Sequence, residues 1–353
     1  MIYQLTIEPL GETIEVAEGQ RMLDACLRAG IWLPYACNHG LCGTCKVQVL
    51  EGEIEHTEEA SLFALMDVER EEGKCLACST VLATDCVIEV DVDPEPDARN
   101  FAIRDFTARV DRIETLTPTI KAIFLEAPGI EFQAGQYINV FVPGVDGPRA
   151  FSLASPPSAR HLLELNIRRV DGGAATSYLC DTLKAGESVR CSGPLGRFFV
   201  RVSAPEPILL LAGGSGLSSP KSMILDLFER GEKRAVTLIY GARNRAERYY
   251  ADLFEALASQ HQNFTYIPVL SEPATDDAWT GETGFVHDAA GRQFNHRFEG
   301  HKAYLCGPPA MIEACIRTLM QGRLFERDIY TEKFLTAADA AQGLARSPLF
   351  RRL

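Results

Sequence analysis

The feature that most constrains this chain is a group of closely spaced cysteines near its N-terminus. The group comprises Cys37, Cys42 and Cys45, with Cys78 further along the chain. This is the spacing with which plant-type [2Fe–2S] proteins hold their cluster. Gly40 and Gly43 lie between these cysteines, and glycine lets the loop backbone approach the inorganic sulfides because it lacks a Cβ atom and tolerates positive φ. The spacing therefore predicts a [2Fe–2S] cluster.

A zinc ribbon is the alternative interpretation of the same residues. The pairs Cys42–Cys45 and Cys75–Cys78 each have the Cys-x2-Cys spacing of structural zinc sites. Zinc would leave Cys37 and both loop glycines without a role, so we favour the iron–sulfur cluster. The cysteines in periodic apolar stretches are expected to be core residues, namely Cys26, Cys86, Cys180, Cys191 and Cys315.

The charge of the chain is concentrated in its first quarter. Residues 1–93 contain 5 basic and 18 acidic residues and so carry the whole net charge of −13. Nucleic acid is excluded as the main partner, because phosphate binding needs clustered Lys and Arg. No apolar run approaches the ~20 residues that span a bilayer, and the N-terminus has no basic, apolar leader. We therefore expect a cytoplasmic protein with no membrane contact, whose acidic region keeps it soluble or steers it toward a basic partner.

Hydrophobic periodicity divides the chain into successive regions. Between residues 103 and 203, short strands separated by turns predict a small antiparallel barrel. Between 204 and 338, buried-type strands alternate with helices, one of them expected over 246–260, which predicts a doubly wound parallel sheet. The acidic, proline-containing stretch 91–100 indicates a linker. The expected boundaries are 1–93, linker 94–102, 103–203, 204–338 and a C-terminal tail 339–353.

Two short motifs in the barrel region are each weak alone and coherent together. The segment RAFS (149–152) ends one predicted strand, and GGAATS (172–177) opens a helix after another. Arg149 can form charge-assisted hydrogen bonds to a pyrophosphate, and a helix start of small residues exposes backbone N–H groups to the same anion. Phe151 and the hydroxyl of Ser152 then remain for an isoalloxazine ring. The pair predicts a flavin site.

Two further motifs lie at the ends of predicted parallel strands. AGGSGLSS carries Gly213, Gly214 and Gly216 at a strand-to-helix turn. It is not a G-x-G-x-x-G fingerprint, but it offers the same close backbone approach and a helix N-terminus facing a diphosphate. YLCGPP places Cys306 and Gly307 at the carboxyl end of another strand, where ligands of open α/β sheets bind. Both motifs predict a dinucleotide site.

The ordered set of motifs resembles the reductase components of bacterial multicomponent oxygenases over nearly the whole chain. The segments that carry the resemblance are CNHGLCGTC, CLAC, RAFSLAS, NIRRVDGGAAT, AGGSGLSSP, CGPPAM and the aromatic of TEKF. FALMDVER, GARNRAE, LMQGRLFERDIY and KAYLCGPP resemble the phenol hydroxylase subgroup most. The resemblance implies a β-grasp α+β [2Fe–2S] ferredoxin domain, an antiparallel β-barrel that binds FAD, and an α/β parallel-sheet domain that binds NAD(P)H. It also selects Cys78 over Cys75 as the fourth cluster ligand.

The resemblance implies a role for each matching residue. The FAD pyrophosphate would be held by Arg149, Gly173, Ala174, Ala175 and Thr176. The flavin would be contacted by Phe151 (where many relatives have Tyr), Ser152, Asn166, Ile167 and Arg168. The nicotinamide dinucleotide would be held by Gly213, Gly214, Ser215, Gly216, Leu217, Ser218, Cys306 and Gly307. Ser152 near flavin N5, Cys306 beside the nicotinamide and Phe334 shielding the flavin would act in the reaction.

The implied activity is electron transfer. NADH would reduce FAD, the flavin would pass electrons singly to the cluster, and the acidic ferredoxin domain would deliver them to a di-iron phenol hydroxylase on a separate protein. Another oxygenase (a ring-hydroxylating dioxygenase, an alkene or a methane-type monooxygenase) is the alternative acceptor. A redox sensor or simple carrier would need no nicotinamide site, and two motifs here predict one. NADH is the expected donor, although Arg243 could accept a 2′-phosphate.

Overall fold

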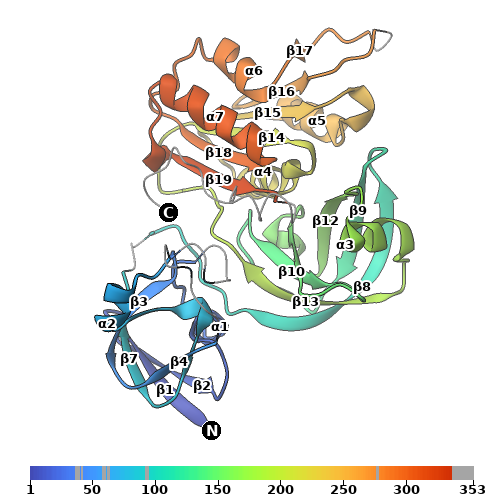
Figure 1. Cartoon of the computed structure of the whole chain (residues 1–353). Helices are drawn as coiled ribbons and strands as arrows, with labels where there is room; N and C mark the ends of the chain where they lie inside the picture. The colour runs from blue at the N-terminus through green and yellow to red at the C-terminus, as the bar shows by residue number, and fades with distance from the viewer. Residues whose placement is uncertain are drawn as a thin grey trace. The chain divides into compact units, whose positions relative to one another are not determined.

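The computed structural model describes residues 1–35, 40, 43–57, 61, 64–91, 95–275 and 278–335. The chain forms two compact units, Met1–Arg104 and Asp105–Leu353. Figure 1 shows the course of the chain through both. In the described part of the chain, no helix is both long and apolar enough to cross a membrane.

The N-terminal unit is built on a five-stranded mixed sheet in the order β2-β1-β7-β3-β5. Its strands are β1 (Ile2–Glu8), β2 (Glu12–Ala17), β3 (Lys46–Glu51), β5 (Lys74–Leu76) and β7 (Cys86–Glu89). A separate pair contains β4 (Ile54–His56) and β6 (Thr80–Leu82). Helix α1 (Met22–Arg28) buries Met22 and Cys26 in the core, whereas α2 (Asp67–Glu71) buries no residue.

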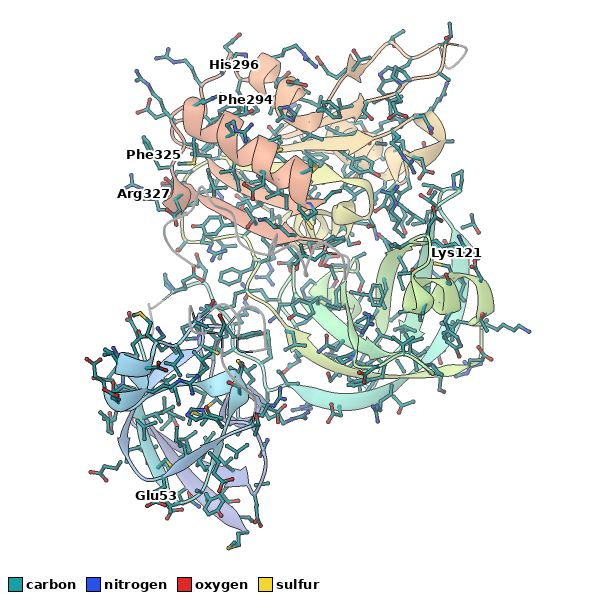
Figure 2. The ribbon with its side chains drawn as sticks, in the orientation of Figure 1. Glu53, Lys121, Phe294, His296, Phe325 and Arg327 are labelled. Carbon is teal, nitrogen blue, oxygen red and sulfur yellow. The ribbon has the colours of Figure 1, made fainter. Side chains whose placement is uncertain are left out.

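The second unit begins with a six-stranded sheet in the order β11-β10-β13-β8-β9-β12. Its strands are β8 (Arg104–Thr115), β9 (Ile120–Glu126), β10 (Tyr137–Phe141), β11 (Arg149–Ser152), β12 (Leu162–Arg168) and β13 (Ser188–Leu195). A bridge between Leu153 and Leu165 brings the two edges together, so the sheet is a nearly closed barrel. Lys121 of β9 donates to the carbonyl of Cys180, just after the short helix α3 (Ala174–Ser177) (Figure 2). The predicted antiparallel barrel is confirmed.

The rest of this unit is a six-stranded sheet in the order β17-β16-β15-β14-β18-β19, and its neighbouring strands are parallel. The strands are β14 (Ile208–Gly213), β15 (Val236–Ala242), β16 (Phe264–Leu270), β17 (Glu282–Thr283), β18 (Lys302–Gly307) and β19 (Ile329–Lys333). The helices are α4 (Ser218–Glu229), α5 (Ala251–Gln260), α6 (Val286–Gln293) and α7 (Pro309–Gln321). The predicted doubly wound parallel sheet is confirmed.

The two faces of the parallel sheet bury different partners. Leu209 and Leu211 of the fully buried strand β14 pack with residues of α6 and α7. Leu210 and Ala212 face the other way and share a core with residues of α4 and α5. That second core also contains the barrel residues Ile120, Ala134 and Phe198. The barrel and the parallel sheet are therefore joined by a continuous apolar contact within one unit.

One predicted helix differs from the observed one. A helix was expected over 246–260, but α5 begins at Ala251. Tyr250 has a φ of 54°, in the left-handed region, and residues 245–247 form a separate 3-10 turn. The side chain of Asn244 accepts from the backbone N–H of Glu247 and starts that turn. Because Tyr250 is not helical, the chain bends here before α5 starts.

Candidate functional site

The glycine-rich turn after β14 forms one wall of a cavity of about 170 Å³. The cavity lies at the carboxyl ends of the parallel strands, where ligands of open α/β sheets bind. Its lining includes Arg168, Gly213, Gly214, Gly241, Arg243, Ser271, Phe285, Pro308 and Met311. Gly213 and Gly214 come from the expected dinucleotide motif, and Arg168 from the expected flavin motif. The structure thus brings two of the sequence-derived groups to one place.

Gly216 explains why this turn needs a residue without a side chain. A methyl group on its Cα would lie 2.6 Å from the Cα of Gly307 and closer still to the carbonyl oxygen of Cys306. Both are backbone atoms at the end of β18 and cannot rotate away. The ends of two motifs far apart in the sequence, AGGSGLSS and LCGPP, therefore meet in direct backbone contact.

On the neighbouring strands β18 and β19, the carboxylate of Glu332 accepts hydrogen bonds from three donors in distant parts of the chain. Oε2 of Glu332 accepts hydrogen bonds from Ser152 Oγ at 3.1 Å, from Ser219 Oγ at 2.5 Å and from Cys306 Sγ at 3.4 Å. Ser152 ends barrel strand β11, Ser219 lies in the first turn of α4, and Cys306 and Glu332 are register partners on β18 and β19. The expected reaction residues Ser152 and Cys306 are thus joined through Glu332.

The environment of this group keeps its acidic members protonated more readily than usual. Burial raises the pKa of the Glu332 carboxyl, and the hydrogen bonds from Ser219, Cys306 and Ser152 oppose that rise. Burial also raises the pKa of the Cys306 thiol, and the neighbouring Glu332 carboxylate adds to that rise. At neutral pH Cys306 is therefore a thiol that donates a hydrogen bond, rather than a thiolate nucleophile.

Sequence reasoning missed Glu332 and Ser219. The available signal is weak, since Glu332 is one charged residue in the TEKF segment, whose resemblance to the family rests on its aromatic residue. That aromatic, Phe334, is partly buried against the core shared by the barrel and the parallel sheet. Its backbone N–H donates to the carbonyl of Gly307 at 2.9 Å. The structure therefore places Phe334 at the same strand end as Cys306 and Gly307.

The expected flavin residues of β12 alternate between the two faces of the strand. Ile167 points into the barrel core, so only its backbone is available to a ligand in the cavity. Asn166 lies on the opposite face, together with Glu164 and Arg168. Its Nδ2 donates to Glu164 Oε1 at 2.7 Å, and its buried Oδ1 has no hydrogen-bond partner in the described part of the chain. An orphaned buried acceptor of this kind fits a ligand that supplies a donor, such as a flavin ring N–H.

The expected pyrophosphate residues lie at the surface. Arg149 is exposed, and its Nη1 donates to the carbonyls of Asp146, Gly147 and Pro148. These bonds use one terminal nitrogen of the guanidinium, and within the described residues its other nitrogens make no hydrogen bond, so they could bind an anion. Gly173 precedes α3, whose residues Ala174 to Thr176 present backbone N–H groups that lack partners within so short a helix. Phe151 is partly buried against the barrel core. These residues fit a flavin dinucleotide.

In the N-terminal unit, the structure describes two of the four expected cluster ligands. Cys45 and Cys78 are buried, and the backbone N–H of Ala77 donates to the carbonyl of Cys45 at 2.9 Å, which brings Cys78 next to Cys45. Gly40 and Gly43 have φ values of 71° and 76°, in the left-handed region that the loop was expected to need. Cys37 and Cys42 lie outside the described residues.

Cys75, the other candidate for the fourth ligand, has a different environment. It is completely buried on β5, opposite Val47 of β3. Burial raises the pKa of its thiol to about 12. Cys78 is buried as well, so burial does not separate the two candidates, and Cys78 stays the predicted fourth ligand.

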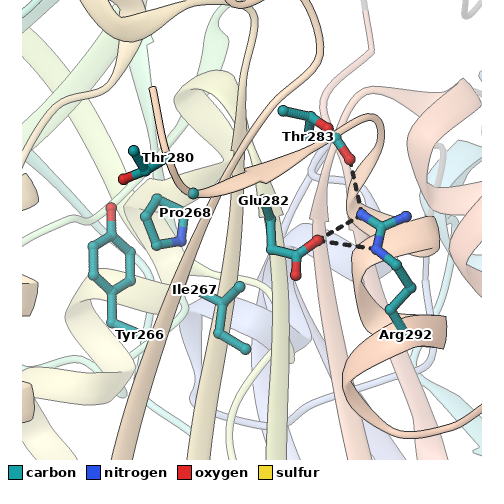
Figure 3. Close-up of a pocket in the computed structure, with 8 residues that line it drawn as sticks. Tyr266, Ile267, Pro268, Thr280, Glu282, Thr283 and Arg292 are labelled. Carbon is teal, nitrogen blue, oxygen red and sulfur yellow. Dashed lines mark hydrogen bonds and ion pairs between the residues drawn. The ribbon is translucent and has the colours of Figure 1, made fainter. Parts of the chain in front are cut away.

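A second, larger opening of about 610 Å³ lies at the edge of the parallel sheet, away from these motifs (Figure 3). Arg292 forms hydrogen bonds with both Glu282 Oε2 and the carbonyl of Thr283 on its rim. Glu282 and Arg292 are thus paired with each other, and we assign no function to this opening.

Comparison with known protein families supports the same assignment of successive regions of the chain to the cluster, FAD and NADH. Residues 5–83 match the 2Fe–2S iron–sulfur cluster binding domain, residues 108–200 the oxidoreductase FAD-binding domain, and residues 210–317 the oxidoreductase NAD-binding domain. The first match answers the zinc alternative in favour of the cluster. The chain is thus an oxidoreductase whose cofactors are FAD and a [2Fe–2S] cluster and whose substrate is NADH.

Similar proteins cover the chain from end to end. It is 56% identical to the reductase component of phenol 2-monooxygenase from Pseudomonas sp. (strain CF600), with all of both chains aligned. It is also 56% identical to the phenol hydroxylase P5 protein of Acinetobacter pittii (strain PHEA-2), again over all of both. Among solved structures, the Amycolatopsis cytochrome P450 reductase GcoB is 34% identical, covers 94% of this chain and 98% of its own, and superposes with a TM-score of 0.83. The chain therefore belongs to the family of iron–sulfur flavoprotein reductase components that pass electrons from NADH to multicomponent oxygenases.

Proposed function

We propose that this reductase serves a phenol-hydroxylating, di-iron oxygenase carried on separate protein chains. The observation that carries the proposal is the 56% identity, over the full length of both chains, to two reductases of phenol hydroxylases. The arrangement at the barrel–sheet junction supports the reductase part of this function. Ser152 of the barrel, and Cys306 and Glu332 of the parallel sheet, meet there in one hydrogen-bonded group.

Different residues of this site would bind NADH and FAD. We propose that residues 213–218 and Gly307 bind the NADH diphosphate through backbone N–H groups, and that Arg149 with residues 173–176 binds the FAD pyrophosphate. Ser152, Cys306 and Asn166 would then orient the two rings, and Phe334 would cover the flavin until the nicotinamide arrives. When bound, FAD supplies the exchange between a two-electron donor and the one-electron cluster.

The buried carboxylate of Glu332 would position the neighbouring side chains rather than take part in the reaction. It accepts from the Ser152 hydroxyl and the Cys306 thiol, so it fixes the rotamers of both side chains across the junction. A reaction governed by the alignment of two bound rings needs such fixed walls more than it needs an acid or a base.

The N-terminal unit, which would carry the iron–sulfur cluster, is the proposed docking surface for the oxygenase. We propose Cys37, Cys42, Cys45 and Cys78 as the cluster ligands. Helix α2 and its flanking residues expose carboxylates together with two apolar side chains, Met66 and Val68, which are 56% and 60% exposed. This segment begins next to Ala64, whose carbonyl oxygen lies 3.0 Å from where a Cβ on Gly43 of the cluster loop would be. Acidic residues around an apolar centre suit a partner with a basic rim.

A reconstituted turnover assay tests the proposed partner. The reductase is combined in turn with the oxygenase components of a phenol hydroxylase, a propane monooxygenase and a ring-hydroxylating dioxygenase, and substrate-dependent NADH oxidation is measured. We expect coupled turnover with the phenol hydroxylase and at least tenfold less with the others. Equal or faster turnover with another oxygenase would reject phenol hydroxylase as the partner, while leaving the reductase assignment intact.

Ionic strength tests the docking surface in the same assay. Because exposed charges are screened beyond about 8 Å at 0.15 M salt, the apparent KM for the oxygenase should rise steeply between 0.05 and 0.5 M NaCl. Reduction of ferricyanide, a small acceptor that needs no protein docking, serves as the control. If salt leaves the KM for the oxygenase unchanged, electrostatic docking on the acidic domain is wrong.

A further inference from the structure

A buried carboxylate on the outer face of the barrel forms a polar network that extends beyond the site described above. Glu164 lies on β12 and is only 6% exposed. Its Oε2 accepts from the ammonium of Lys221 in α4 at 2.5 Å. Its Oε1 accepts from Tyr250 Oη at 2.5 Å and from Asn166 Nδ2 at 2.7 Å. One barrel residue thus receives donors from two separate segments of the parallel-sheet domain.

Backbone contacts reinforce the same connection. Lys221 also donates to the carbonyl of Ala154 at 3.3 Å, and the next residue, Ser222, donates to the carbonyl of Ser155 at 2.7 Å. The hydroxyl of Ser155 in turn accepts from the backbone N–H of Glu164. The start of α4 is therefore tied to the barrel segment that follows Ser152.

The position of Lys221 in α4 links this network to the group around Glu332. The helix starts directly after the glycine-rich turn, and its second residue, Ser219, donates to Glu332 in the group that contains Ser152 and Cys306. Lys221 follows two residues later. Any shift of the start of α4 relative to the barrel would therefore displace Ser219 and the glycine-rich turn together.

We propose that Glu164 is a positioning residue for the reaction. Its carboxylate holds the start of α4 and the Tyr250 turn against the barrel, and so sets the distance between the half of the site on the barrel and the half on the parallel sheet. It also fixes the amide of Asn166 with Oδ1 directed away from Glu164, available to a donor on the bound ring. The proposal concerns the step between NADH and flavin, so it is independent of which oxygenase accepts the electrons.

Binding and reaction should respond differently to the loss of this carboxylate. The cavity of the glycine-rich turn is lined mainly by the parallel-sheet domain, so that domain still binds the coenzyme when the junction loosens. Alignment of the coenzyme with the flavin, by contrast, requires the barrel and the parallel-sheet domain to keep their relative position. A misplacement of about 1 Å can cost on the order of 100-fold in rate. We therefore expect a fall in kcat with little change in KM.

The test compares two variants of the holoenzyme with one control. Glu164→Gln removes the charge, and Tyr250→Phe removes one donor but leaves the ion pair in place. Glu126→Gln is the matched control, since Glu126 ends the adjacent strand β9 and forms an exposed ion pair with Arg109. Each is assayed for NADH–ferricyanide turnover per bound flavin and for hydrogen–deuterium exchange of the peptide 218–224.

For Glu164→Gln we expect kcat to fall at least tenfold, the KM for NADH to change less than threefold, and exchange in 218–224 to accelerate. Tyr250→Phe should show the same pattern at about threefold, and Glu126→Gln should show none of it. If Glu164→Gln does not fold, Tyr250→Phe decides alone. Unchanged kcat per bound flavin with unchanged exchange in 218–224 would overturn the proposal, as would an equal effect in Glu126→Gln.

Discussion

Replacing Gly216 with alanine tests whether direct backbone contact between the glycine-rich turn and the end of β18 is essential. The added methyl would lie 2.6 Å from the Cα of Gly307, whereas ordinary contact begins at about 3.4 Å. The turn and the strand end must therefore separate by about 1 Å. The neighbouring atoms are backbone atoms of Cys306 and Gly307, so a side-chain rotation cannot relieve the overlap.

This displacement should lower both activity and stability. Overpacking of this kind costs about 1–3 kcal/mol of folding free energy. The same displacement moves Cys306 relative to Glu332 and Ser152, and a 1 Å misplacement at a reacting centre costs roughly 100-fold, or about 2.7 kcal/mol in the activation free energy. NADH–ferricyanide kinetics per bound flavin would measure this loss, and thermal unfolding would measure the stability.

Gly231→Ala is the control for the effect of a methyl group alone. Gly231 follows α4 with a φ of 74°, and a Cβ there would meet no atom within 4 Å. The left-handed conformation should cost about 1–2 kcal/mol of stability with normal turnover. If Gly216→Ala keeps kcat/KM within threefold of the parent, or if Gly231→Ala loses as much activity, the reasoning from backbone contact fails.

Three further outcomes follow from the site. Burial raises the pKa of Glu332, so the contribution of this carboxyl to stability is present at low pH and is lost as pH rises through its folded pKa. Because glutamine does not titrate, the melting temperature of Glu332→Gln relative to the parent should increase between pH 4 and 8. The turnover of this variant should fall. Cys78→Ala should abolish the visible cluster absorbance, whereas Cys75→Ala should keep it and lose about 1 kcal/mol of stability. Arg243 is exposed beside the cavity; Arg243→Ala should lower kcat/KM for NADPH at least fivefold and for NADH less than twofold, as paired assays would show.

The architecture could be predicted because its signals are local. The run Ile208–Gly213 is apolar throughout and is buried throughout, as expected for a central parallel strand. The glycines at 213, 214 and 216 occupy the strand-to-helix turn where the motif placed them. Period, turn residues and strand-end motifs each depend on a few consecutive residues, so a single sequence contains all the information they need.

The start of α5 shows where local reasoning fails. Residues 246–250 have helical propensity, yet Glu247 accepts hydrogen bonds from Thr117 and Thr119, and Tyr250 donates to Glu164. Each of these partners lies more than 80 residues away in the sequence. Contacts with the barrel outweigh a few tenths of a kcal/mol per residue of helix propensity. The helix therefore begins only after the last of these contacts.

The carboxylates that sequence reasoning missed share one property. Glu164 and Glu332 are single acidic residues within strands, a pattern that normally indicates a solvent-facing position. Both are instead enclosed at the junction between the barrel and the parallel sheet, and each accepts from three donors. A buried carboxyl group is tolerated there because both domains supply hydrogen-bond donors, so the sequence of one domain alone does not account for it. Such residues follow from domain packing rather than from either domain's own sequence. The junction also lies beside the cavity where NADH and the flavin should meet, so the residues hardest to predict are the ones that align the reaction.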